Sequence, residues 1–264
     1  MNAPIRIGIG GWTFEPWRGT FYPEGLSQKK ELEFASRALT AIEVNGTYYS
    51  GFKPATFEGW AKTAPDGFVF AVKASRFCTN RKILAEGGES IARFVGQGIV
   101  ELGEKLGPIL WQFMATKKFD AADFGAFLKL LPASHDGVKL RHAIQVRHES
   151  FRVPEFVAMC RDAGAAIVFA DSPEYPAIAD VTGDFVYARL ESGKDENPLC
   201  YPEGDIGHWA EVAKCWASGD RPEGLPYVTE DLPARHPRES FIFFIHGGKV
   251  CAPAAAQALI ERVK

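Results

Sequence analysis

Short apolar runs alternate with amphipathic runs along the chain. Eight runs rich in Ile, Val and Phe and bounded by turn residues predict strands, at residues 5–12, 41–48, 68–74, 107–113, 142–149, 166–171, 185–191 and 240–246. Between them, apolar residues at helical spacing predict helices over residues 28–39, 90–105 and 154–163. Two more helices are predicted to have Asp120 and Asp205 as N-caps, and Pro253 opens a last one. Strands that alternate with helices in this way form a parallel sheet.

Eight such units in 264 residues predict one α/β domain, residues 1–264, folded as a TIM-type (β/α)8 barrel. We expect two irregular segments. The crossover between the sixth and seventh strands has no strong helix pattern, and a Pro-rich insertion at residues 220–239 precedes the eighth strand. The alternative is an open doubly wound sheet, although no G-x-G-x-x-G motif opens a helix after the first strand.

Seven of the predicted strands end in polar or charged residues, whereas a parallel strand covered on both faces should be almost wholly apolar. These ends are Glu43–Asn45, Lys73, Gln112, Gln145–Glu149, Asp171, Arg189–Glu191 and His246–Gly248. Active sites of (β/α)8 barrels lie at the carboxyl ends of the strands. The pattern therefore predicts a site at that face.

The alternation of side chains along a strand predicts which of these groups point into the barrel. If the apolar residues face the helices, the inward acids are Glu43, Glu149, Asp171 and Glu191, and the inward bases are Lys73, Arg147 and Arg189. His148 faces outward and backs the site as a packing histidine. Buried charges must pair with each other or with a ligand. A structural layer of ion pairs that fills the barrel is the alternative to an active site.

The candidate catalytic residues are Glu43, Lys73, Asp171 and Arg147. Glu43 or Asp171 would act as general acid or base, and the cations would hold a phosphate or carboxylate. The candidate substrate-binding residues, on strand ends and the loops that follow them, are Trp12, Trp17, Asn45, Tyr48, Arg76, Thr79, Gln112, His148, Arg189, Tyr201, His246, Gly247 and Gly248.

Two of the loops suggest particular contacts. The aromatic loop at Trp12 and Trp17 either stacks on a sugar or base ring or forms a hydrophobic cover. Gly247 and Gly248 precede the last helix, so their backbone amides could approach an anion, or they form a plain turn. Tyr201 would reach over the site as part of a lid.

Composition limits the partners. The net charge is −3 without any run of five like charges, which argues against a broad nucleic-acid or membrane surface.

The start of the chain lacks a signal-peptide pattern, and the five cysteines are scattered without a CxxC motif, so we expect a cytoplasmic protein without a disulfide framework. Cys78 and Cys251 are read as inert thiols rather than nucleophiles. No cofactor motif occurs, and a divalent metal on Glu43, Glu149, Asp171 and His246 stays open.

Several segments, in order over nearly the whole chain, resemble the motifs of the family known as domain of unknown function 72. They are GGWTFEPWRGTFYP, AIEVNGTYYS, FVFAVKASRFCTN, LGPILWQF, AIQVRHESF, VFADSP and FVYARL. The resemblance implies a TIM-type barrel of unassigned activity. The chain departs from the family pattern at Asn80, where histidine is usual, and at Ile245–Gly247, where Phe-Asn-Asn is common.

We therefore expect an enzyme that acts by acid–base chemistry on a small anionic or sugar-like substrate at the carboxyl face of the barrel. One alternative is a divalent-metal-dependent phosphoester hydrolase, for which nucleic acid is one candidate substrate. Another is a barrel that binds a ligand or partner without turnover. No sequence feature alone decides among the three.

Overall fold

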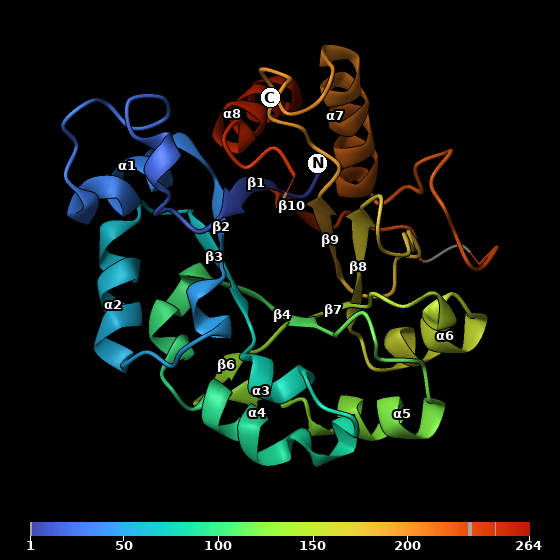
Figure 1. Cartoon of the computed structure of the whole chain (residues 1–264). Helices are drawn as coiled ribbons and strands as arrows, with labels where there is room; N and C mark the ends of the chain where they lie inside the picture. Colours follow the sequence, from blue (N-terminus) through green and yellow to red (C-terminus); the bar gives the residue numbers. More distant parts are fainter. Residues whose placement is uncertain (1, 232–233, 246) are drawn as a thin grey trace.

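Eight parallel strands form a closed barrel, as predicted, in a computed structural model that describes residues 2–231, 234–245 and 247–264 (Figure 1). In barrel order the strands are β1 (Ile5–Gly10), β10 (Glu239–Phe244), β9 (Phe185–Leu190), β8 (Ala166–Asp171), β7 (His142–Gln145), β4 (Leu106–Gln112), β3 (Val69–Lys73) and β2 (Ala41–Val44). A small hairpin of β5 (Ser134–His135) and β6 (Val138–Lys139), which was not predicted, lies outside the barrel.

Helices surround the barrel (Figure 1). They are α1 (Glu31–Ala38), α2 (Pro54–Thr63), α3 (Arg76–Thr79), α4 (Gly88–Val95), α5 (Ala121–Leu130), α6 (Pro154–Asp162), α7 (Glu203–Ser218) and α8 (Ala252–Val263). Asp120 caps α5 as predicted, because its side chain accepts a hydrogen bond from the backbone of Asp123. The predicted cap at Asp205 is wrong, since α7 already begins at Glu203.

Both irregular segments are confirmed for the part of the chain that the structure describes. Residues 172–184, between β8 and β9, contain no helix or strand, and neither do the described residues between α7 and β10. The predicted helix over residues 90–105 is instead two elements. Gly98, in the left-handed region at φ 107°, separates α4 from a 3-10 segment, η5 (Ile99–Lys105).

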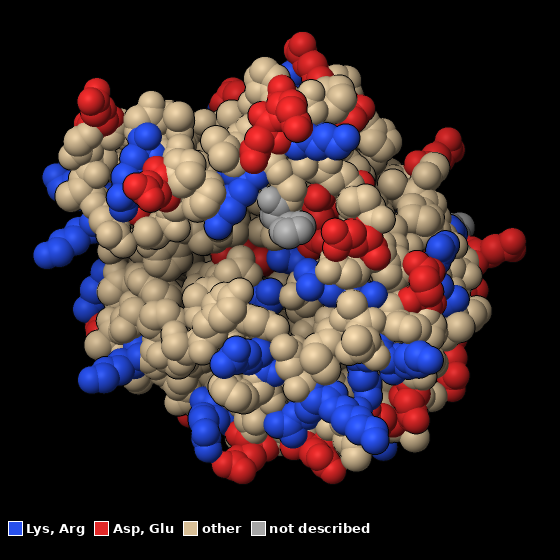
Figure 2. Space-filling model, viewed as in Figure 1, with Lys and Arg blue, Asp and Glu red and all other residues tan. Residues whose placement is uncertain are grey.

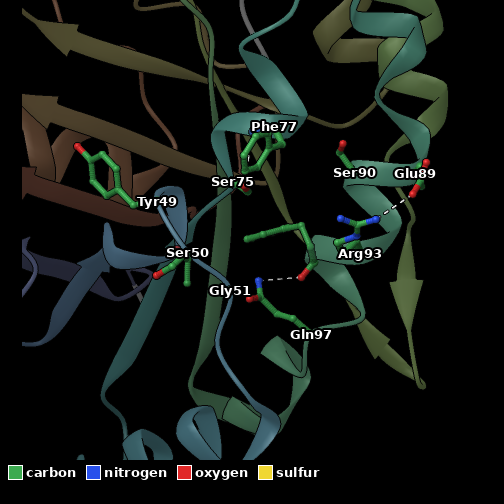
Figure 3. A pocket seen from close by; sticks show the side chains of 11 residues that line it. Tyr49, Ser50, Gly51, Ser75, Phe77, Glu89, Ser90, Arg93 and Gln97 are labelled. Carbon is green, nitrogen blue, oxygen red and sulfur yellow. Dashed lines mark hydrogen bonds and ion pairs between the residues drawn. The ribbon is translucent and has the colours of Figure 1, made fainter.

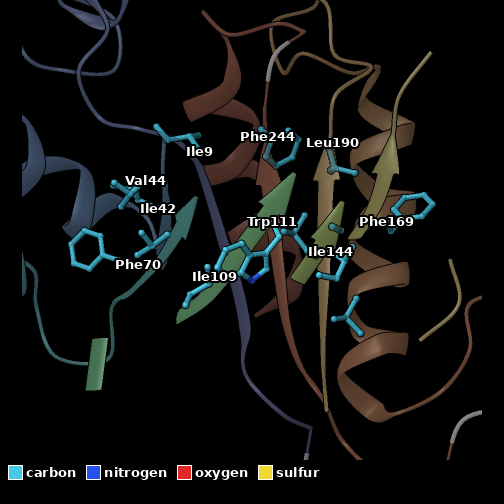
Figure 4. Packing of buried hydrophobic residues seen from close by; sticks show 14 of the residues in the cluster. Ile9, Ile42, Val44, Phe70, Ile109, Trp111, Ile144, Phe169, Leu190 and Phe244 are labelled. Carbon is cyan, nitrogen blue, oxygen red and sulfur yellow. The ribbon is translucent and has the colours of Figure 1, made fainter. Parts of the chain in front are cut away.

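Two apolar layers result from the alternation of side chains along the strands. Outward residues such as Ile42, Trp111 and Phe169 pack against the helices (Figure 4). A smaller inner cluster, which includes Ala41, Phe241 and Phe243, fills the middle of the barrel. Inside the barrel, the apolar residues thus separate one polar end from the other.

The amino end of the barrel contains an ion-paired group. Glu239 forms two ion pairs. Its Oε1 lies 2.8 Å from Arg6 Nε, and its Oε2 lies 2.5 Å from Arg141 Nη1. This group lies at the face opposite the polar strand ends, so it is not the layer of charged strand ends that the sequence left as the alternative to an active site. Within the described residues, no helix has the length and hydrophobicity needed to span a membrane.

Candidate functional site

A buried carboxylate–guanidinium pair lies at the centre of the polar layer. Glu43 in β2 and Arg189 in β9 both point into the barrel and are almost fully buried. Arg189 Nε donates to Glu43 Oε2 and Arg189 Nη2 to Glu43 Oε1, each at 3.1 Å. Tyr187 Oη donates to Oε2 at 2.6 Å, and Asn45 Nδ2 donates to Oε1 at 3.0 Å. Each oxygen of Glu43 thus has two donors.

These contacts keep Glu43 ionised. Burial would raise its pKa, but Arg189, Lys73 and the hydrogen bond from Tyr187 lower it by more, so the pKa lies below its usual value. A carboxylate that is already ionised and fully bonded is a poor candidate for proton transfer. Its catalytic role stays a prediction, and in this structure it orients Arg189.

Gln145 and a second acid, Glu191, complete the bonding of Arg189, and Gln112 supports Gln145. Arg189 Nη1 donates to Gln145 Oε1 at 2.8 Å and to Glu191 Oε1. Gln145 Oε1 also accepts from Gln112 Nε2 at 2.7 Å, and Gln145 Nε2 donates to Glu191 Oε1 at 3.2 Å. All three guanidinium nitrogens of Arg189 are therefore in use within the protein.

Lys73, at the carboxyl end of β3, is the first cation with unused bonding capacity. It is 9% exposed, its Nζ lies 4.3 Å from the centroid of the Tyr48 ring, and it makes no ion pair with the acids that the structure describes. Burial and the positive charge of Arg189 lower its pKa from 10.5 to about 7. At neutral pH this amine can both give and take a proton.

Arg147 is the second such cation, two residues beyond β7. Its guanidinium carbon lies 4.3 Å from the centroid of the Tyr175 ring, and its Nε is buried without a hydrogen-bond partner among the described residues. Burial, followed by the charge of Arg189, lowers its pKa. A buried N–H without an acceptor is costly unless a ligand supplies one.

Glu191 adds an acceptor to the same cluster. Its Oε1 is bonded to Arg189 and Gln145, whereas its Oε2 is buried and, within the described chain, unpartnered. The central cluster, which we define as Lys73, Arg147 and Glu191, therefore offers two donors and one acceptor that the protein does not satisfy. Figure 2 shows blue Lys and Arg side chains around the centre of the visible face.

The expectation that Asp171 points inward is wrong. Asp171 shares a strand face with Phe169, which packs against Trp209 and Trp216 of α7, outside the barrel. Its Oδ2 accepts a hydrogen bond from Tyr201 Oη at 2.7 Å. The two residues line a separate pocket of about 410 Å³ next to α7, so Tyr201 is no lid over the central cluster.

Glu149 is also not inward, because β7 ends at Gln145 and the chain turns away. Its side chain is 70% exposed and lies 3.8 Å from Arg152. His148 caps the following 3-10 turn, accepting the backbone N–H of Ser150 on Nδ1 at 3.1 Å. This agrees with a packing histidine rather than one that contacts substrate.

In the aromatic loop after β1, Trp17 is buried, whereas Trp12 is partly exposed and lines a pocket of about 1000 Å³ beside α2. Trp17 is 1% exposed, and its Nε1 donates to the carbonyl of Lys249 at 2.8 Å, so the expected ring contact with substrate is wrong for Trp17. Trp12 packs edge-on against Trp60 at 5.0 Å and also contacts Phe70, an outward residue of β3. Both tryptophans thus lie outside the central cluster.

A carboxylate of the protein binds the two residues that immediately precede α8. Asp195 Oδ1 accepts the backbone N–H groups of Val250 at 2.9 Å and Cys251 at 3.4 Å. Gly247 and Gly248 pack closely against the loop that follows β9. These contacts do not involve the amides of Gly247 and Gly248, and the anion site expected there stays a prediction. His246 lies outside the described residues.

A pocket of about 500 Å³ lies next to the segment that carries Tyr48 (Figure 3). It is lined by Thr47, residues 49–51, Ser75, Phe77 and α4, and Tyr49 and Phe77 are largely exposed. Arg76 is exposed over the Phe77 ring, and the buried Thr79 Oγ1 has no partner among the described residues. Neither residue is among those that line the pocket, and their expected contacts with substrate stay predictions.

Three bonding residues were not among the sequence-based site residues: Tyr187, Gln145 and Glu191. Strand alternation already placed all three inward, so the signal was present. Tyr175 lies in the irregular loop after β8, and nothing in its sequence context indicated a contact with Arg147. The described residues include no group of three or more His, Cys, Asp or Glu arranged to hold a metal ion.

The fold and the central cluster define a (β/α)8 barrel protein with a charged site at the carboxyl ends of its strands. The chain belongs to the family described as "Protein of unknown function DUF72", whose sequence model matches residues 6–264. A comparison with proteins of curated function gave no match.

Solved structures share the fold. A DUF72 family protein from Thermotoga maritima MSB8 is 23% identical with a TM-score of 0.70, covering 97% of each chain. One from Enterococcus faecalis V583 is 17% identical with a TM-score of 0.70, covering 98% of this chain and 97% of its own. A xylose isomerase-like TIM barrel/4-hydroxyphenylpyruvate dioxygenase fusion protein is 16% identical with a TM-score of 0.57, covering 99% of this chain and 43% of its own.

Proposed function

We propose that this barrel is an enzyme that binds a small phosphate- or carboxylate-bearing metabolite at the central cluster and moves a proton with Lys73. The observation that carries the proposal is the unused bonding capacity of Lys73, Arg147 and Glu191 in a layer that is otherwise fully paired. Within the described chain, unpartnered charged atoms also occur elsewhere, at Glu31 Oε2 and Arg238 Nε, so it is the grouping of Lys73, Arg147 and Glu191 at the carboxyl ends of three barrel strands that favours a ligand site.

Each group suits a separate task. Arg147 Nε can donate to an anionic oxygen of the ligand, since its charge lies beside the Tyr175 ring without a carboxylate partner. Glu191 Oε2 can accept a hydrogen bond from a hydroxyl group of the ligand. Lys73, with a pKa of about 7, is ready to act as general acid or base at neutral pH. Glu43 and Arg189 hold the surrounding layer in place.

Titration calorimetry with inorganic phosphate and with citrate tests the binding step. Lys73→Met and Arg147→Met should each weaken binding by about tenfold or more, because a hydrogen bond to a charged group contributes roughly 1.5–3 kcal/mol. The exposed cations Lys82 and Arg152 provide matched controls, and Lys82→Met and Arg152→Met should bind as the unaltered protein does. Equal loss in all four variants would indicate a nonspecific charge effect and contradict the proposal.

Turnover is tested by incubating the protein with pooled phosphorylated and carboxylated metabolites and following their masses. Once a substrate is found, Lys73→Met should lower the rate by about 10²–10⁴-fold, the range expected for the loss of a general acid or base. Specific binding without any conversion would instead identify a ligand-binding barrel.

A further inference from the structure

Two cysteines that are distant in sequence meet at the rim of the barrel. Cys200 lies at the end of the loop after β9, and Cys251 immediately precedes α8. Their sulfur atoms are 2.6 Å apart, and both thiols are free. Because a disulfide bond requires the two sulfur atoms to come within about 2.05 Å, only a small side-chain movement separates this pair from a covalent link.

The backbone at Gly248 contacts both sulfur atoms and leaves room for them to lie side by side. The carbonyl oxygen of Gly248 lies 3.0 Å from Cys200 Sγ and 3.2 Å from Cys251 Sγ. Gly248 has φ 65°, and a Cβ at this position would lie 3.0 Å from both Cβ and Sγ of Cys200. Glycine at residue 248 therefore leaves the space that the sulfur pair occupies.

Other contacts hold the two segments together independently of the sulfurs. Asp195 Oδ1 bonds to the backbone of Val250 and Cys251, and the backbone N–H of Lys194 donates to the carbonyl of Cys200 at 2.8 Å. Cys200 itself is held at φ 60°, a conformation uncommon for residues other than glycine. The thiols are thus aligned before any reaction takes place.

We propose that Cys200 and Cys251 form a reversible disulfide by exchange with a low-molecular-weight disulfide. Cys251 is the partly exposed member, so its thiolate attacks the small disulfide, forms a mixed disulfide and releases one small thiolate. The Cys200 thiolate then attacks Cys251 Sγ, which forms the intramolecular bond and releases the second small thiol. Two protein thiols lose two electrons and two protons, and the small disulfide is reduced to two thiols.

The environment makes the first step slow and the second step favourable. Burial raises the pKa of both thiols, so a small fraction of each is ionised at neutral pH. The second step is intramolecular between groups already in contact, which favours it strongly over a second encounter with solution thiol. The product links the loop after β9 to the start of α8.

The full-length protein, equilibrated with glutathione buffers from fully reduced to fully oxidised and then denatured and alkylated, tests this proposal. The chain has five cysteines, so oxidation should leave three that can be alkylated, with a mass loss of two hydrogens and a peptide joining Cys200 to Cys251. Cys200→Ser and Cys251→Ser should abolish the cross-link. Cys215→Ser, at another partly exposed cysteine, should retain it.

Three results would overturn the proposal. They are five alkylated cysteines at every redox potential, a cross-link that involves a different cysteine, and a glutathione adduct on Cys251 that persists in the unaltered protein. Circular dichroism of each variant shows whether it is folded, and the unaltered protein gives the cysteine count without any substitution. The outcome is independent of whether the central cluster binds an anion.

Discussion

Arg189 binds Glu43 through two nitrogens, Nε and Nη2, each 3.1 Å from a different carboxylate oxygen. The pair joins β9 to β2 across the interior of the barrel, and both side chains are almost fully buried. Such a pair stabilises the native state only while both partners are present, because one buried charge left alone is costly.

Glu43→Gln should therefore lower the free energy of unfolding by about 3–5 kcal/mol, the usual effect of removing one partner of a buried pair. Urea unfolding followed by fluorescence measures this change. Glu89→Gln is the control, since Glu89 pairs with Arg93 on the surface of α4, where ion pairs contribute little. A loss similar to that of the control would show that Glu43 does not anchor the layer.

The depressed pKa of Lys73 predicts how stability changes with pH. The unfolded chain binds the proton with a pKa near 10.5 and the folded protein with a pKa of about 7, so between these values the unfolded state carries more protons. The contribution of Lys73 to the free energy of unfolding therefore rises as pH increases from about 7 to about 10.

Lys73→Met should remove this contribution. Over that pH range, the free energy of unfolding of the unaltered protein should rise steadily relative to that of the variant. Other groups that titrate there cancel in the difference. Urea titrations at several pH values give the measurement, and a difference that stays constant with pH would mean that the pKa of Lys73 is close to normal.

Asp171 should be dispensable for the chemistry of the central cluster. Its carboxylate bonds to Tyr201 outside the barrel, so Asp171→Asn should leave phosphate and citrate affinity unchanged. Tyr201→Phe, which removes the partner hydroxyl, should destabilise the protein by about 0.5–1.5 kcal/mol, because the partly exposed carboxylate of Asp171 loses a hydrogen bond. A tenfold loss of affinity in Asp171→Asn would return this residue to the site.

Asp195 should stabilise the start of α8. Asp195→Ala removes the acceptor for the backbone N–H groups of Val250 and Cys251, which precede the helix, and loss of such hydrogen bonds costs about 0.5–1.5 kcal/mol. Glu196→Ala, at the exposed neighbouring position, is the control and should leave the melting temperature nearly unchanged. Equal melting temperatures for the two variants would contradict this role of Asp195.

The sequence was sufficient for the barrel and for part of the site because both follow from local alternation. Tyr187 and Arg189 lie within a regular strand, so their inward direction could be predicted from the apolar residues between them. The same rule failed for Glu149, which follows the end of β7, where alternation no longer applies.

Asp171 shows a second limit. It lies within β8, where alternation from Phe169 places it outward, whereas its position at a strand end alone suggests a residue of the site. The contacts of Arg147 with Tyr175 and of Cys200 with Cys251 depend on how irregular loops fold over the rim. No periodic pattern encodes such contacts, so they require the three-dimensional structure.

Gly247 provides a test of the rim that is independent of any charge. A Cβ at residue 247 would lie 2.3 Å from the carbonyl oxygen of Gly193 and 2.6 Å from that of Glu191, and backbone atoms cannot move aside as a side chain can. Gly247→Ala should therefore destabilise the protein by about 1–3 kcal/mol, as overpacking does. It should also weaken anion binding, because Glu191 belongs to the central cluster.

Gly204→Ala, in α7 with no atom within 4 Å of the new Cβ, is the matched control and should stabilise the helix by about 0.5–1 kcal/mol. If Gly247→Ala unfolds at the same urea concentration as Gly204→Ala, the two loops are not in close contact in solution.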